Sequence, residues 1–218
     1  MFQTQLEFIR QQLPASLLPY AFIAGGAAIA PQTAGDIDVF ILGGNTEELE
    51  NHLFTLHSVA DMANFTTSDR SPREQAKYLE GLGTLAGIEF IANLFDPATG
   101  EKVQFISVRT YSVFELLESF DISTHAWAIG LESGRRYSLP TASTTPAQLP
   151  RVLHISNPVI TLRRLKKLCA RYGWEWDPHP DLEKLREHAT KSGLIYQLDM
   201  ELHRSRMGVV NLFEEVPF

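Results

Sequence analysis

Short apolar runs that end at Gly, Pro or polar residues recur through the first 131 residues, and this pattern predicts strands. The run DIDVFIL is apolar enough to indicate a buried strand. GIEFIANLF and KVQFISV lie on either side of DPATGE, a Pro/Gly turn of hairpin length. We therefore expect a sheet of about four or five strands. They are one strand that ends at Gly25-Gly26, followed by 36–42, 87–95, 102–108 and 125–131.

Apolar residues three and four positions apart predict helices in the other segments. The first helix is expected over 2–13, and a second begins at Thr46, has acidic residues in its first turn and runs to about Met62. Residues 63–84 are polar and mixed, and we interpret them as irregular, with a short helix over 72–79. Further helices are expected over 112–119, 158–172 and 181–204.

The character of the chain changes near residue 135. Residues 138–150 are rich in Ser, Thr and Pro, which is typical of a linker. We therefore expect a unit of sheet and helices over 1–135, a linker over 136–157 and a helical C-terminal region over 158–218. The fold class that follows is α/β of the α+β kind, a mixed sheet backed by helices with a small helical C-terminal segment.

The composition is that of an ordinary globular protein, with 44% apolar and 21% charged residues. No apolar run approaches the roughly 18 residues of a membrane span, and the N-terminus lacks the pattern of a signal peptide. The single cysteine, Cys169, excludes an internal disulfide and fits a reducing cytoplasm. The net charge of −7 argues against a surface built to coat nucleic acid and leaves only a local basic patch for such a partner.

Two carboxylates lie on one face of the strand expected over 36–42. Because side chains alternate across a strand, Asp36 and Asp38 point to the same side. Neighbouring carboxylates repel each other, and in a buried strand they are costly unless a cation lies between them. A divalent cation that prefers oxygen ligands, Mg²⁺ or Mn²⁺, meets this need.

A glycine pair upstream is a second candidate binding feature. Gly25 and Gly26 allow the backbone to turn sharply and approach a ligand, which leaves amide N–H groups for phosphate oxygens. Alone, a Gly-Gly turn or an Asp-x-Asp strand is most often structural, but FIAGGAAIA followed by DIDVF is more specific. Over residues 15–131 the chain resembles the nucleotidyltransferase superfamily, which includes DNA polymerase beta, poly(A) polymerases and CCA-adding enzymes.

The resemblance implies a nucleotidyltransferase-like fold and a metal-dependent transfer reaction. Gly25 and Gly26 would hold the triphosphate of a nucleoside triphosphate such as ATP. Asp36 and Asp38 would hold two metal ions, Mg²⁺ or Mn²⁺. The short chain resembles the minimal members seen in phage and viral genomes, which would work in the host cytoplasm.

One position departs from the family pattern. Family members supply a third carboxylate from a later strand, and the matching strand, KVQFI, carries Gln104 there. A neutral amide cannot supply the charge or act as a base, which puts turnover in doubt and leaves nucleotide binding unaffected. Glu89 or Asp121 are the alternative carboxylates, although Glu89 also fits the polar side of a sheet.

Asp121 has two interpretations. It lies in FDISTHAWAIG, which resembles the segment that contacts the nucleotide near its sugar in CCA-adding enzymes. An aspartate between a helix and a strand is equally typical of a cap.

The helix expected over 158–172 concentrates basic residues. From Arg151 to Trp174 the chain has no acidic residue. Such a patch could hold a triphosphate or the backbone of an acceptor RNA or DNA, and a solvated helix face is the alternative. The basic residues of this helix are Arg163, Arg164, Lys166, Lys167 and Arg171.

The leading hypothesis is a metal-dependent nucleotidyltransferase that transfers a nucleoside monophosphate to an RNA 3′ end, a protein hydroxyl or a small molecule. The alternative is a binding or regulatory module of the same fold that has lost catalysis. A dinucleotide-binding oxidoreductase is disfavoured because the Gly-x-Gly-x-x-Gly spacing is absent. The candidate catalytic residues are Asp36, Asp38 and Gln104, and the candidate nucleotide-binding residues are Gly25, Gly26, Asp121, Arg163, Arg164 and Lys167.

Overall fold

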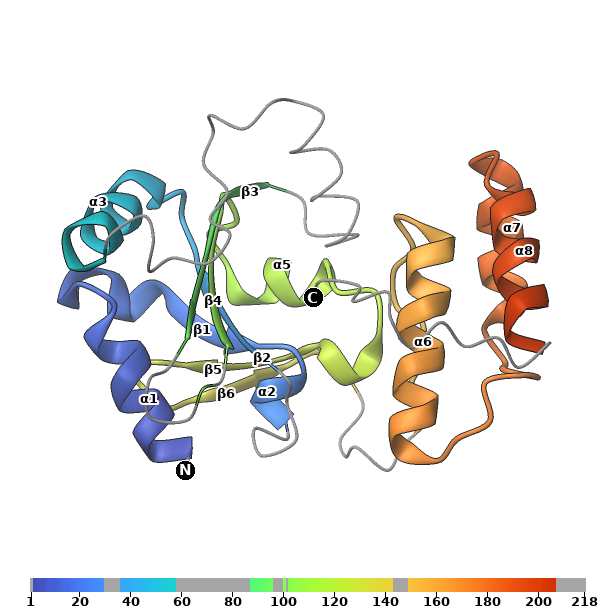
Figure 1. The fold of residues 1–218 in the computed structure, drawn as a ribbon, viewed down its shortest axis with the longest axis horizontal. Coiled ribbons are helices and arrows are strands. Elements are labelled where there is room, and N and C mark those ends of the chain that lie inside the picture. Colours follow the sequence, from blue (N-terminus) through green and yellow to red (C-terminus); the bar gives the residue numbers. More distant parts are fainter. Residues whose placement is uncertain are drawn as a thin grey trace.

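The computed structural model describes residues 2–29, 36–57, 87–95, 100, 102–142 and 149–206. In this part of the chain six strands form one mixed sheet in the order β3-β4-β2-β1-β5-β6. β2 and β4 run parallel, and all other neighbours are antiparallel. The strands are β1 (Ala21–Ala24), β2 (Asp36–Ile41), β3 (Ile88–Phe95), β4 (Lys102–Val108), β5 (Trp127–Gly130) and β6 (Arg136–Ser138) (Figure 1).

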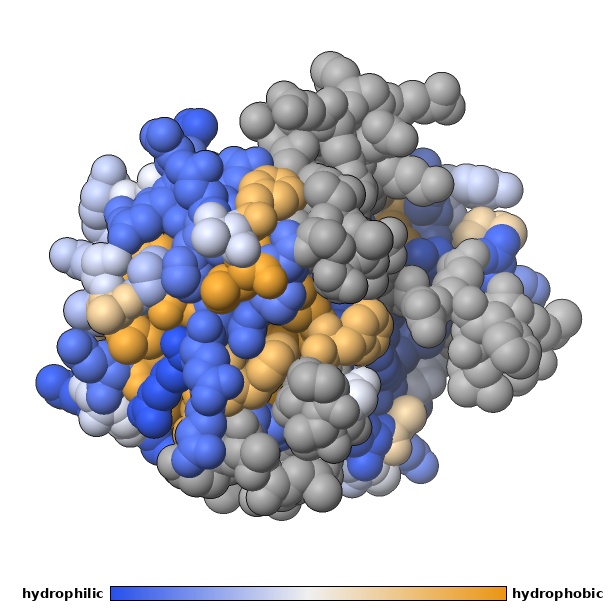
Figure 2. Space-filling view, turned by 60° about the vertical axis from the view of Figure 1, so that its left-hand side comes forward, coloured by the Kyte–Doolittle hydropathy of each residue, from blue (hydrophilic) through white to orange (hydrophobic). Residues whose placement is uncertain are grey.

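One face of the sheet packs on the N-terminal helices. α1 (Phe2–Gln11), the 3₁₀-turn Ala15–Tyr20 and α3 (Thr46–Leu56) bury Ile9 and Leu49 against the odd-numbered residues of β2. Figure 1 shows α1 and α3 together on this side of the sheet. Seen with this side brought forward, apolar residues reach the surface in a patch framed by hydrophilic ones (Figure 2).

The opposite face is divided between an apolar part and a polar corner. α5 (Val113–Glu118) covers the apolar part, where Phe40 of β2 meets the ring of Phe120 edge to face at 5.8 Å. The short helix α2 (Gly26–Ile29) and the 3₁₀-turn Ser123–His125 lie against each other near the start of β2. The start of this strand, where the aspartates are, is therefore left to polar side chains.

Three helices form a separate apolar cluster beside this face: α6 (Pro158–Tyr172), α7 (Leu182–Lys191) and α8 (Ile195–Arg206). The sequence marks both ends of α6. The Asn157 side chain accepts hydrogen bonds from the amides of Val159 and Ile160, Pro158 occupies the first turn, and Gly173 ends the helix with a φ of 70°.

Asp181 ties the helical region to the sheet. Its buried carboxylate accepts hydrogen bonds from Arg151 Nε (2.8 Å) and Nη2 (2.9 Å) and from the amide of Val152 (2.9 Å), and it pairs with Lys184 Nζ (2.9 Å). Val152 in turn forms a β-bridge with Ile122, directly before the turn that leads into β5. This connection ties the start of α7 to the segment that pairs with Ile122.

The observed strands follow the apolar pattern in the first 131 residues, and the differences concern the ends of helices and the chain after residue 135. The linker expected over 136–157 contributes β6, so the sheet has a sixth strand where about four or five were expected. The helix expected over 181–204 is two helices, because the chain turns at Ser192–Leu194, where Gly193 has a φ of 72°. The first two helices end earlier than expected, at Gln11 and Leu56.

The irregular segment expected over 63–84, with its short helix over 72–79, lies outside the described residues. Most of the hairpin turn between β3 and β4 does so too. Among the described residues no helix combines the length and apolarity needed to cross a membrane.

Candidate functional site

Asp36 and Asp38 lie at the start of β2, on the face that carries α5 farther along the strand. The register places Asp38 between Ala24 of β1 and Gln104 of β4, and it places Asp36 beside Lys102 of β4. Because paired residues of neighbouring strands point to the same face, these side chains meet at one corner of the sheet. Both aspartates are partly buried there.

The ionised forms of both aspartates are disfavoured at this corner. Burial, with the Asp36 carboxylate second, raises the pKa of Asp38 to about 8, and Lys102 and Arg164 act in the opposite direction. Burial also raises the pKa of Asp36, against the influence of Lys102, Lys167 and Arg171. Without a cation between them, the pair therefore holds a proton more tightly than ordinary carboxyl groups do.

The glycine pair stands next to this corner. Gly25 has a φ of 79°, which side chains rarely adopt, and a Cβ atom there would lie 4.0 Å from Asp38 Oδ2. Its amide donates to the carbonyl of Trp127 (3.1 Å), so this N–H is already used within the sheet. Gly26 opens α2, and a Cβ atom built on it would meet no atom within 4 Å. Space for a ligand is therefore found at Gly26.

The basic residues of α6 divide between two faces. Arg164, Lys167 and Arg171 recur every three or four residues and are the cations of α6 that influence the charges of Asp36 and Asp38. Arg163 Nε and Lys166 Nζ instead pair with Glu201 of α8, at 3.0 and 2.5 Å. The structure thus brings Arg164 and Lys167 to the aspartates and leaves Arg163 on the side of α8.

Asp121 is fully buried between the sheet and α6. Its Oδ2 accepts hydrogen bonds from Thr161 Oγ1 (3.1 Å) and Arg164 Nη1 (3.2 Å). Its Oδ1 and the hydroxyl of Thr124 are buried without a hydrogen-bond partner among the described residues. Asp121 therefore contacts Arg164, and Arg164 is one of the cations that lower the pKa of Asp38.

His125 and Arg171 belong to this environment although neither was among the expected site residues. Burial lowers the pKa of His125 to about 4, with Asp121 opposing and Arg164 and Arg171 assisting the shift, so the imidazole is neutral at pH 7. The signal in the sequence is the position of His125 in the same segment as Asp121, FDISTHAWAIG. For Arg171 it is the helical spacing from Arg164 and Lys167.

Gln104 lies directly opposite Asp38 and is fully buried. Its Nε2 donates to Asn93 Oδ1 (2.7 Å), and Asn93 is its register partner on β3. Glu89 lies near the other end of β3, where it accepts hydrogen bonds from Thr46 and Arg109. Neither Glu89 nor Asp121 therefore stands where Gln104 does, and two amides occupy this part of the corner.

No family model matches the sequence, and no curated protein matches it. Two of the similar solved structures have a TM-score of 0.51 each. One is a tRNA-processing enzyme that is 21% identical; the match covers 84% of this chain and 46% of the enzyme's chain. The other is a CCA-adding enzyme in complex with CTP that is 16% identical; the match covers 91% of this chain and 48% of the enzyme's chain. The chain thus spans about half the length of each.

These likenesses concern the fold. The protein has the nucleotidyltransferase-like fold. The expected fold class is confirmed, and the similarity extends past residues 15–131 into the C-terminal helices, because it takes in 91% of the chain.

The donors at the corner suit a single hard divalent cation. Mg²⁺ is usually held by one or two carboxylates together with substrate phosphates, and Asp36 and Asp38 supply two carboxylates on one face. Among the described residues no group of three or more His, Cys, Asp or Glu side chains is arranged for a metal ion. The two carboxylates could hold one such cation, which would take its remaining ligands from outside these side chains.

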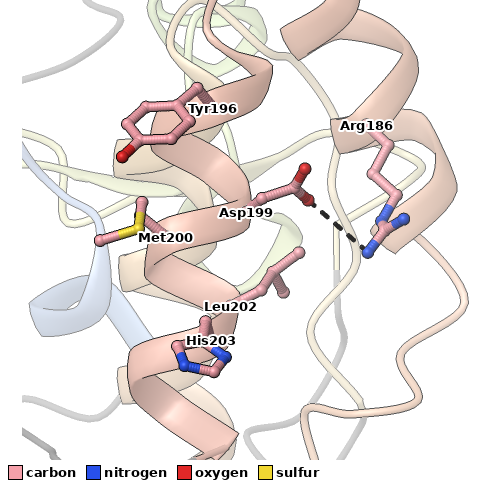
Figure 3. Close-up of a pocket in the computed structure, with 6 residues that line it drawn as sticks. All are labelled: Arg186, Tyr196, Asp199, Met200, Leu202 and His203. Carbon is pink, nitrogen blue, oxygen red and sulfur yellow. Dashed lines mark ion pairs between the residues drawn. The ribbon is translucent and has the colours of Figure 1, made fainter.

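A pocket of about 360 Å³ lies elsewhere, between α7 and α8. Figure 3 shows Tyr196, Met200 and His203 along one side of α8, and Arg186 paired with Asp199 at 3.8 Å. None of the candidate site residues lines it, so it has no part in the site at the sheet corner.

Proposed function

We propose that this protein is a metal-dependent nucleotidyltransferase that binds a nucleoside triphosphate between the start of β2 and α6. The observation that carries the proposal is the pair of partly buried carboxylates, Asp36 and Asp38, opposite the cations Arg164, Lys167 and Arg171. A divalent cation on the carboxylates and a polyanion against the helix would satisfy both groups. The CCA-adding enzyme of the same fold was solved with CTP, which supports a nucleoside triphosphate as the polyanion.

The residues of the proposed site divide into metal ligands, phosphate contacts and one positioning residue. Asp36 and Asp38 hold Mg²⁺ or Mn²⁺, which when bound neutralises phosphate charge and lowers the pKa of an attacking hydroxyl. Lys167 and Arg171 bind phosphate oxygens, and the backbone at Gly26 gives the phosphates room. Asp121 orients Arg164 through its hydrogen bond and does not itself contact the nucleotide.

The acceptor we test first is an RNA 3′ end, because the similar structures are those of a tRNA-processing enzyme and a CCA-adding enzyme. A protein hydroxyl and a small molecule are the other acceptors to test. The pairing of Arg163 and Lys166 with Glu201 leaves fewer cations of α6 for an RNA backbone than the sequence suggests. RNA would therefore meet the protein mainly at the sheet corner that carries Asp36 and Asp38.

The experiment is a thermal-shift titration with each nucleoside triphosphate, with Mg²⁺, with Mn²⁺ and without metal. A ligand at 100 times its Kd adds about 2.7 kcal/mol, which raises the Tm of a chain of this size by roughly 5–10 °C. Asp36→Asn combined with Asp38→Asn should abolish the metal-dependent shift. Asp199→Asn, the same chemical change at an exposed site on α8, should preserve it. A full shift in the double variant would contradict the assignment.

A second function is favoured by one observation, the buried hydrogen bond between Gln104 and Asn93 where the family has a third carboxylate. The alternative is a binding or regulatory module that holds the triphosphate without turnover. Transfer of labelled nucleotide to RNA by the wild-type protein would contradict this alternative. Transfer by Gln104→Glu alone would support it.

A further inference from the structure

Lys102 lies at the sheet corner, on the strand that carries Gln104 in place of a third carboxylate. It precedes Gln104 by two residues on β4, so both side chains point to the face that carries the aspartates. Lys102 is the register partner of Asp36, and neighbouring strands are about 4.8 Å apart. Of the neighbouring cations, Lys102 lowers the pKa of Asp36 and of Asp38 most.

The carboxylates of Asp36 and Asp38 together carry two negative charges, which balance the charge of one divalent cation. A second ion about 3.5–4 Å away would need a further carboxylate, because two neighbouring cations repel each other. Gln104 and Asn93 occupy that direction, and both are buried, neutral and hydrogen-bonded to each other. The donor set thus departs from what two metal ions require.

We propose that this site binds its triphosphate with one divalent cation, and that the Lys102 ammonium supplies the positive charge that a second cation would bring. The inference rests on the proposed function, since it concerns the same triphosphate. Lys102 differs from Lys167 and Arg171 in its origin. They face the site from α6, whereas Lys102 belongs to the strand that would carry the third carboxylate.

The first test counts bound ions. Mn²⁺ is titrated into the wild-type protein with a saturating α,β-methylene analogue of ATP or CTP, and bound Mn²⁺ is counted by electron paramagnetic resonance and equilibrium dialysis. We expect one ion per chain with the spectrum of an isolated Mn²⁺. Two ions with a spin-coupled spectrum would overturn the inference and leave the proposed function standing. No bound ion with either analogue would overturn the proposed function and the inference with it.

The second test isolates Lys102. Lys102→Gln should weaken binding of the same analogue about tenfold, as expected for a lost charge-assisted contact, and should leave one Mn²⁺ per chain at saturation. Lys191→Gln, at an exposed position near the end of α7, is the matched control and should leave the affinity unchanged. Circular dichroism and the melting temperature verify that both variants fold. Unchanged affinity in folded Lys102→Gln would overturn the role of Lys102.

Discussion

At the scale of single residues, the protonation of Asp38 couples the site to pH. Its folded-state pKa of about 8 lies above the usual value of 3.8, so the native state binds this proton more tightly than the unfolded chain. The stabilising contribution is complete below about pH 4 and is lost as pH rises through about 8. A bound divalent cation reverses this preference, because it favours the ionised carboxylate.

We therefore expect the protein without metal to lose thermal stability between about pH 5 and 8, and the stabilisation by Mg²⁺ plus triphosphate to be larger near pH 8 than near pH 6. Differential scanning fluorimetry across this range measures both effects. Asp38→Asn keeps the shape of the side chain without the ionisation and should flatten the decline. Identical profiles for the variant and the wild type would contradict the assignment to Asp38.

The residues of the site differ in how far the sequence reveals them. Strand alternation alone places Asp36 and Asp38 on one face, because a period of two is fixed by the backbone. Gln104 joins them through the register between β2 and β4, which the structure shows. Which basic residues of α6 face the aspartates depends on how that helix docks, and no local pattern encodes docking. Arg163 was therefore expected in the site, whereas the structure pairs it with Glu201.

At the scale of elements, α6 carries two sets of cations that interact with different partners. Arg163 and Lys166 hold Glu201 of α8, and the Lys166 ammonium also lies 5.6 Å from the ring centroid of Trp176. Lys167 lowers the pKa of Asp36, and burial lowers the pKa of Lys167 itself. Adjacent lysines of one helix thus have different partners, and only Lys167 belongs to the site that we propose.

The two lysines allow a matched comparison. Lys167→Gln should weaken triphosphate binding about tenfold, since a charge-assisted contact contributes roughly 1.5–3 kcal/mol. Lys166→Gln should leave that affinity within about twofold and lower the free energy of unfolding by roughly 1–3 kcal/mol, because its pair with Glu201 is largely buried. Isothermal titration calorimetry and urea unfolding measure the two quantities. Equal losses of affinity would show that α6 presents a single basic face.

Among the connections between elements, we expect the loss of Asp181 to lower the free energy of unfolding most. Burial opposes its charge, but hydrogen bonds from Arg151, Lys184 and Val152 hold its pKa well below the usual range. Its contribution is present above about pH 4 and is lost as pH falls toward the folded-state pKa. Asp181→Asn should cost about 3 kcal/mol in urea unfolding at pH 7.

The control for this variant is Asp199→Asn, which removes an exposed carboxylate 3.8 Å from Arg186 and should change stability by less than about 1 kcal/mol. The difference between the variants should shrink as pH falls below 4, because the unfolded wild-type chain then binds a proton at Asp181 while the folded protein does not, which removes the stability that the ionised carboxylate contributes. A difference that persists at low pH would assign the effect to shape and not to charge.

Elements were predictable from the sequence where local signals agree. Asn157, Pro158 and Gly173 mark the ends of α6, and apolar runs mark the strands up to β5. β6 was missed because the three residues Arg136–Ser138 pair only through their position beside β5. The split of 181–204 has a local sign, Gly193, but the apolar spacing continues across it.

At the scale of the whole molecule, the proposed ligand lies between two separately packed parts. The aspartates belong to the sheet and the cations to α6, whose apolar side packs in another cluster with α7 and α8. Asp181 and the bridge between Ile122 and Val152 connect the parts without the ligand, and so do the hydrogen bonds that Asp121 accepts from α6. A bound triphosphate with its metal ion would add a further connection, because it would contact both sides at once.

We therefore expect Mg²⁺ plus triphosphate to slow amide hydrogen exchange in β2 and α6 together, and to leave α1 and α3 on the opposite face of the sheet nearly unchanged. At 100 times Kd the slowing should reach about 100-fold for amides that exchange by opening of the site, which corresponds to about 2.7 kcal/mol. Hydrogen–deuterium exchange mass spectrometry measures it, and the protein with Asp36→Asn and Asp38→Asn is the control. Protection confined to β2 would show that the ligand does not reach α6, and protection confined to α6 would identify a polyanion site that works without the aspartates.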